Sequence, residues 1–151
     1  MLASETDTLG EALSSLDEQI DALEDRLSDL DTSTDEADAV RAQRTRLQYL
    51  RPRVSWHAAD PADDPGTHDG AWGPDTEVTV GALTAGEKAM MHREIPPDAG
   101  EEEHQLWYVA AATESAPYVE GDLSETLASV ADLHPAFVDW VEARSNALGV
   151  A

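Results

Sequence analysis

The sequence predicts a mainly α protein: an N-terminal helical hairpin or coiled coil, then a small helical C-terminal module with at most one short strand. Leucine and isoleucine recur at alternating intervals of four and three residues from Leu9 to Leu30, the spacing of a helix that packs along one stripe. Capping pairs and prolines mark further helix ends. Alternation of apolar and polar residues, which is typical of a strand, is confined to residues 77–83.

The first helix is expected from about Leu9 to Leu30, after residues 1–8, which we expect to be loose. Thr8 and Glu11 have the spacing of a capping box, which satisfies free amide groups at a helix start. The predicted seam of this helix consists of Leu9, Leu13, Leu16, Ile20, Leu23, Leu27 and Leu30. The seam covers only about three heptads, which is marginal for a free-standing coiled coil.

A second helix is expected over residues 35–51. Ser33 and Glu36 form a second predicted capping box, and Pro52 is expected to end the helix because the residue before proline disfavours helical geometry. The apolar stripe is sparser here. Its seam positions are Val40, Leu47 and Leu50.

Charge separates the two predicted helices. Residues 1–40 are strongly acidic, whereas residues 41–53 contain no acid and five arginines: Arg41, Arg44, Arg46, Arg51 and Arg53. A parallel pair of first helices would set acids against acids, so an acidic helix covered by its own basic partner is favoured. Self-association of such hairpins remains compatible with this pattern. The alternative is that the arginines bind nucleic acid or an acidic partner.

Residues 55–76 are rich in Pro, Gly and Asp and are interpreted as a linker. The predicted modules are therefore residues 1–54 and 77–151. Trp56 and Trp72 are candidates for docking on a neighbouring surface, because an all-polar spacer has no need of tryptophan. The linker histidines and aspartates leave a cation site open, but their spacing fits no known cage and a solvated loop is favoured: His57, Asp60, Asp63, Asp64, His68 and Asp69.

The C-terminal module is expected to begin with a strand-like segment at Val78 and Val80 and to continue as helices. Thr84 with Glu87 and Asp122 with Glu125 are further capping pairs. The predicted helices are residues 85–93, 101–115, 122–131 and 135–148. Aromatic candidates for partner binding in this module are Trp107, Tyr108 and Tyr118.

The charge of the chain is extreme, since 32 Asp and Glu face nine basic residues and the formal net charge is −23. Lys88 is the only lysine. A surface rich in carboxylates suits molar salt, where charge repulsion is screened within about 3 Å. This composition resembles that of haloarchaeal proteins. It argues against generic binding to DNA, RNA or anionic lipid, so nucleic acid and membrane are not expected partners.

The sequence offers little that indicates catalysis. It has no cysteine, no nucleophile elbow, no P-loop and no dinucleotide fingerprint. The sequence 101–104, "EEEH", lacks the paired histidines of a zinc protease helix, and His92 and His134 look isolated. No catalytic residue, cofactor or metal ligand is assigned, and we expect a protein that is not an enzyme. No apolar run reaches membrane-spanning length and no signal peptide is evident, so an intracellular location is expected.

Three segments resemble a known family. "EVTVGALTAGEKAMM", "LWYVAAATESAPYV" and "LSETLASVADLHPAFVDWVEARSNAL" follow one another within residues 77–150, in an order similar to that of the tail assembly chaperones of tailed phages. The resemblance implies a helical protein that binds the tape-measure protein and tail subunits, without catalytic residues. With the composition, it implies an assembly protein in the host cytoplasm or virion of a haloarchaeal tailed virus.

Two alternatives follow from the N-terminal module, which that family lacks. One is a connector, tail or capsid-accessory component of the virion. The other is a regulatory protein that forms a coiled-coil dimer and binds nucleic acid through the arginines of residues 41–53. Homo-oligomers and other virion or tail-assembly proteins are the expected partners.

Overall fold

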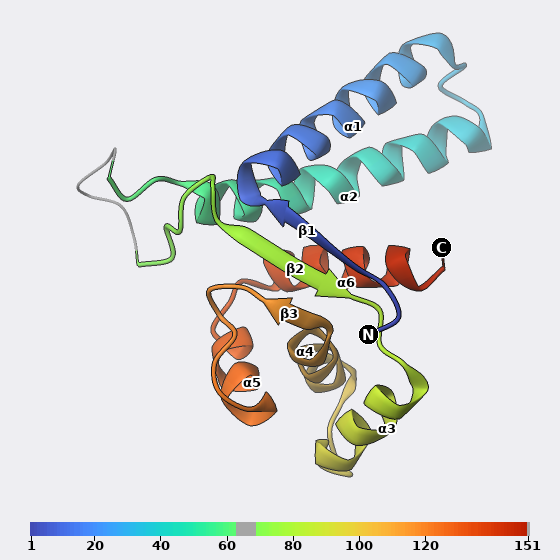
Figure 1. The fold of residues 1–151 in the computed structure, drawn as a ribbon. Helices are drawn as coiled ribbons and strands as arrows, with labels where there is room; N and C mark the ends of the chain where they lie inside the picture. Colours follow the sequence, from blue (N-terminus) through green and yellow to red (C-terminus); the bar gives the residue numbers. More distant parts are fainter. Residues whose placement is uncertain (63–68, 151) are drawn as a thin grey trace. The chain divides into compact units, whose positions relative to one another are not determined.

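The computed structural model describes residues 1–62 and 69–150. The chain divides into two compact units, Thr8–Asp75 and Met1–Asp7 together with Thr76–Ala151. The described residues contain six helices and three strands (Figure 1). The first seven residues therefore belong to the same unit as the C-terminal half of the chain.

Two antiparallel helices build the first unit, α1 (Leu9–Asp29) and α2 (Asp35–Ala58), which pack against each other along the hairpin (Figure 1). The predicted capping box of α1 is present: the Glu11 amide donates to Thr8 Oγ1 over 3.1 Å. The predicted cap of α2 is wrong by one residue. Thr34 caps this helix, because the amide and hydroxyl of Ser33 both donate to Asp31 Oδ1 instead.

Helix α2 does not end at Pro52, contrary to the prediction, but continues for another turn and a half to Ala58. A proline inside a helix removes one backbone hydrogen bond and costs about 3 kcal/mol. Here the ring is exposed, and the residues that follow it, Val54, His57 and Ala58, are buried. Burial of this last turn offsets the local cost of the proline.

The two chain ends of the hairpin unit are held together by backbone hydrogen bonds. The Gly10 amide donates to the Pro74 carbonyl over 2.8 Å, and the Trp72 amide donates to the His57 carbonyl over 2.9 Å. A side chain on residue 10 would place its Cβ 3.1 Å from the Pro74 oxygen, so glycine permits this close approach. The segment predicted as a linker thus returns to α2 and α1.

A three-stranded sheet and four helices build the second unit. The sheet order is β1-β2-β3, and α6 packs against the central strand, β2 (Figure 1). The strands are β1 (Ser4–Thr8), β2 (Glu77–Gly81) and β3 (Thr113–Ser115). The helices are α3 (Ala85–Glu94), α4 (Glu101–Ala112), α5 (Leu123–Ala131) and α6 (Pro135–Gly149).

The predicted fold class is therefore wrong in one respect. The chain is mainly α, but its antiparallel sheet exceeds the single short strand that was expected. Only β2, whose Val78 and Val80 are fully buried, carries the alternation that identifies a half-buried strand. The other two strands were assigned to a loose terminus and to the end of a helix.

Strand β1 is polar because it is an edge strand with little buried surface. It is held by contacts with β2 and α6: Thr6 and Thr79 share a hydroxyl hydrogen bond of 2.7 Å, and Arg144 pairs with Asp7 and lies 3.7 Å from Glu5. These partners lie more than seventy residues away in sequence. A local pattern therefore could not reveal this strand.

Strand β3 interrupts the helix that was predicted to run to residue 115. Thr113 leaves the helix of α4 and lies in register with Val80, where the sheet has a bulge. The Thr113 hydroxyl donates to the Val109 carbonyl over 2.8 Å and lies 2.8 Å from the Tyr118 hydroxyl. Pairing with β2 thus replaces the last helical turn.

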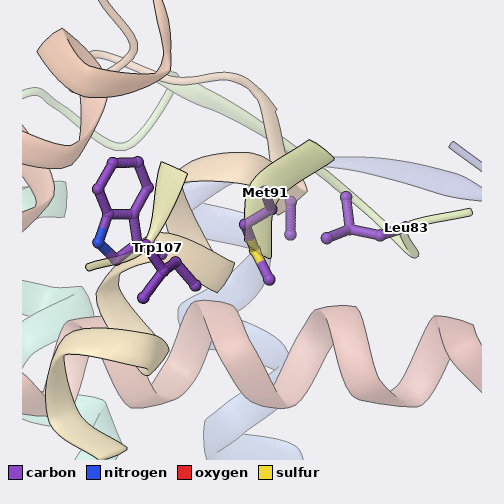
Figure 2. Packing of buried hydrophobic residues seen from close by; sticks show 5 residues of the cluster. Leu83, Met91 and Trp107 are labelled. Atoms are coloured by element: carbon purple, nitrogen blue, oxygen red, sulfur yellow. The ribbon is translucent and has the colours of Figure 1, made fainter. Parts of the chain in front are cut away.

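An apolar cluster joins two helices of the second unit and the segment that follows β2. Met91 of α3 and Trp107 of α4 are buried with Leu83, which follows β2 (Figure 2). Phe137 of α6 is also fully buried, with its ring 5.3 Å from that of Trp140. These aromatic side chains are buried together with a larger number of aliphatic ones, among them Val109, Val130 and Val141.

Candidate protein-interaction surfaces

The predicted seam lies along the hairpin, but only half of it is fully enclosed. Leu9, Leu16, Ile20, Val40 and Leu50 are buried. The remaining seam residues are half-buried: Leu13, Leu23, Leu27, Leu30 and Leu47. Two helices enclose only the stripe between them, so part of this leucine surface stays in contact with solvent.

Ion pairs connect the acidic and basic helices at two places. Arg51 donates to Asp17 of α1 over 2.5 Å, and this hydrogen bond lowers the pKa of Asp17. Near the tip of the hairpin, Arg26 lies 2.5 Å from Glu36. Arg41 pairs instead with Asp38 of its own helix. The predicted facing of the arginines toward α1 is thus observed for one of the five.

The other arginines have different surroundings. Arg46 is exposed. Arg44 is half-buried, and its Nε has no hydrogen-bond partner in the part of the chain that the structure describes. Arg53 lies with its guanidinium 4.9 Å from the Trp56 ring. The five arginines of residues 41–53 therefore differ in exposure and in the groups that they contact.

The two tryptophans of the predicted linker differ in exposure. Trp56 remains 44% exposed on α2. Trp72 is half-buried and stacks on His57 at a ring distance of 4.0 Å. The Nδ1 atom of His57 lies 2.8 Å from the Gly70 carbonyl. Of the aspartates and histidines considered for a cation site, Asp63, Asp64 and His68 lie outside the described residues.

The aromatic candidates of the C-terminal unit lie mainly in its interior. Trp107 is 6% exposed and Tyr118 is 4% exposed, so neither presents much surface to a partner. Burial raises the pKa of Tyr118. Tyr108 is half-buried, and its hydroxyl lies 2.6 Å from Ser145 Oγ, which itself donates to the Gly81 carbonyl. These hydroxyls are committed to internal contacts.

An apolar groove of about 380 Å³ lies among α3, α4 and α5. Its apolar lining consists of Leu83, Met90, Met91, Ala111 and Leu123. Met90 is 65% exposed, an unusual position for a methionine on so polar a surface. No local pattern in the sequence defines this groove, because its lining comes from four separate segments. The unassigned Met-Met pair in residues 90–91 was the only local signal.

A second groove, of about 430 Å³, lies on another face of α3 and α4 and is lined by titratable groups. His92, which looked isolated in the sequence, faces His104 with 6.2 Å between ring centroids. Lys88, Glu101 and Glu142 also line this groove. Nevertheless, no group of three or more His, Asp or Glu side chains suited to a metal ion occurs among the residues that the structure describes.

Comparison of the chain with protein-family models, with curated proteins and with solved structures finds no match. Among residues 1–62 and 69–150, no helix is long and apolar enough to cross a membrane.

Proposed function

We propose that this protein is a salt-adapted assembly protein that is not an enzyme and that self-associates through the hairpin of α1 and α2. The observation that carries this proposal is the row of half-buried leucines along the hairpin, Leu13, Leu23, Leu27, Leu30 and Leu47. Pairing of two hairpins into a four-helix bundle would enclose this row. Hairpin self-association would thereby remove apolar surface that a single hairpin leaves in water.

Charge supports pairing between hairpins. Helix α1 is acidic, and Arg46 of α2 is exposed. When two hairpins pair about a two-fold axis parallel to their helices, the basic helix of one copy approaches the acidic helix of the other, so each interface contains both signs of charge. In molar salt such pairs act only at contact range, and apolar burial supplies most of the affinity.

The biological setting of the proposal comes from the sequence. The resemblance of residues 77–150 to tail assembly chaperones supports a role in building the tail of a haloarchaeal tailed virus, through contacts with the tape-measure protein or tail subunits. The acidic composition supports action in molar salt, in the host cytoplasm or in the virion.

Light scattering in 3 M KCl tests self-association. We expect the mass of a dimer or larger assembly, and we expect the double variant Leu23→Gln, Leu27→Gln to weaken association at least tenfold, since each change places a polar group in the interface. Ala22→Gln, at an exposed position on the same helix, is the matched control and should keep the parent mass. Far-UV circular dichroism verifies that the helices of each variant remain.

Two outcomes would overturn the proposal. The first is a mass of one chain at every concentration. The second is retention of duplex DNA in molar KCl that is lost in Arg44→Gln, Arg46→Gln, because it would assign the basic segment to nucleic acid.

A further inference from the structure

We propose that the groove among α3, α4 and α5 docks a basic, amphipathic segment of a partner protein. This inference extends the proposed assembly function, because it assigns the partner-binding surface to the C-terminal unit rather than to the hairpin. The groove, about 380 Å³, lies at the small end of the range for ligand pockets. It has room for one or two large apolar side chains rather than for a whole domain.

The apolar lining defines the part of the partner that enters. Leu83 and Met91 belong to the buried cluster of this unit (Figure 2) and are only 4% and 5% exposed. The half-buried Leu123 beside them and the exposed Met90 therefore supply most of the apolar surface that a partner can contact. Met90 adds a mobile, polarisable side chain at the opening. Exposed methionines beside an apolar floor adapt to differently shaped apolar side chains, as in other helix-binding grooves.

The charged lining defines what flanks the entering side chain. Glu87, Glu94 and Asp122 line the groove, and no Lys, Arg or His is among its described lining residues. Hydrogen bonds from the Met1 ammonium and from the Thr84 amide lower the pKa of Glu87 to about 2. This carboxylate therefore remains charged at any physiological pH. An apolar residue flanked by Lys or Arg fits this surface, whereas an acidic segment is repelled.

The acceptors differ in how free they are to bind a cation. Asp122 already accepts a hydrogen bond from the Glu125 amide over 2.9 Å, as the cap of α5, and Glu87 pairs with the Met1 ammonium over 2.9 Å. Glu94 ends α3 and is exposed. We therefore assign the main contact with a basic side chain of the partner to Glu94.

Methyl NMR tests the docking directly, because the chain has only three methionines. Met90 and Met91 line the groove, and Met1 does not. With methionine methyl groups labelled, the full-length protein in 2 M KCl is titrated with a helical peptide of Leu and Lys at amphipathic spacing. We expect saturable shifts of the Met90 signal, which reports on this groove, together with shifts of Met91, which also lines the second groove of α3 and α4.

Matched peptides and variants locate the binding. A peptide with Glu in place of Lys should bind at least tenfold more weakly, and a peptide of the same composition without amphipathic spacing should bind no better. The double variant Met90→Gln, Leu123→Gln should weaken binding of the Lys peptide about tenfold. Leu2→Gln changes a side chain that is 72% exposed in the same unit and should have no effect.

The charged lining has its own pair of variants. Glu94→Gln should weaken binding more in 0.5 M than in 3 M KCl, because salt screens the lost ion pair. Glu114→Gln, at an exposed position of β3, is the control for loss of one negative charge.

The inference is overturned if Met90 and Met91 do not shift, if the acidic peptide binds equally, or if Leu2→Gln weakens binding as much as the groove variant does. Shifts that depend on protein concentration without peptide would assign the groove to a second copy and also overturn it. Light scattering on the groove variants keeps the two proposals distinct: the mass of the assembly should be unchanged even where peptide binding is lost.

Discussion

Arg144 links helix α6 to strand β1, a contact that its position in the sequence does not indicate. From α6 it pairs with Asp7 and lies 3.7 Å from Glu5, both on β1, and its guanidinium is 5.3 Å from the Trp140 ring. Its side chain is only 19% exposed. A partly buried arginine with carboxylates on one side and an aromatic ring on the other is well suited to fix an edge strand. In the sequence, Arg144 follows Glu142 in a helical pattern, and nothing local indicates its contacts with β1.

Tyr118 gives a prediction at the same scale. Burial raises its pKa, so the folded protein keeps the phenol protonated while the unfolded chain ionises near pH 10. The contribution of Tyr118 to the free energy of unfolding is therefore fully present below about pH 10. Above that pH it falls by up to about 1.4 kcal/mol per pH unit. Chemical denaturation in high salt between pH 8 and 11.5 measures this slope.

The variant Tyr118→Phe should make that alkaline decline shallower, while losing about 1 kcal/mol at pH 8 because the hydrogen bond to Thr113 is absent. Tyr49→Phe, at a side chain 45% exposed on α2, serves as the control. An equal alkaline slope in both variants would contradict the role of Tyr118.

At the scale of elements, the capping residues predict where helices begin. Tertiary contacts determine where α2 ends and where the strands β1 and β3 form. Thr8, Thr84 and Asp122 each cap the helix expected of them, because capping depends on residues three apart. By contrast, β1 and β3 depend on pairing with a distant strand, and α2 continues past Pro52 because its last turn is buried. The apolar groove was equally invisible, since Leu83, Met90, Ala111 and Leu123 meet only in the fold.

Pro52 gives the prediction for an element. Its exposed ring occupies an interior position of α2, so Pro52→Ala restores a helical hydrogen bond. We expect thermal unfolding to show that the free energy of unfolding rises by about 1–2 kcal/mol. Removing proline from the helix contributes about 3 kcal/mol, and the greater conformational freedom of the unfolded chain offsets part of it. Gln48→Ala, one turn earlier and exposed, should change stability little. A loss in Pro52→Ala would mean that packing of Val54 needs the proline geometry.

At the scale of the whole molecule, the main feature is the formal net charge of −23. Acidic residues occur throughout both units except in the basic stretch of residues 41–53, and few have a basic partner because the sequence has only nine basic residues. Repulsion between carboxylates therefore opposes the compact state whenever screening is weak. The composition therefore predicts salt adaptation, which stays a prediction.

We expect the protein to expand and to lose helical signal below about 0.5 M salt, where screening of the repulsion between its carboxylates weakens. Small-angle scattering and circular dichroism across a KCl series measure the change, and return to 3 M KCl should reverse it. A fully folded chain in dilute buffer would contradict salt adaptation.

The hydrogen bond between Gly10 and Pro74 has a consequence for the order of folding. Strands β1 and β2 are neighbours in the sheet, yet residues 9–76 separate them in the chain. Bringing the ends of so long a flexible segment together carries a large loop-closure entropy. If the hairpin unit forms first and its ends are already joined, only a short length of flexible chain must be closed when β1 pairs with β2. The hairpin is thus an insertion within a β-ribbon, and its early formation would guide the amino-terminal strand to the sheet edge.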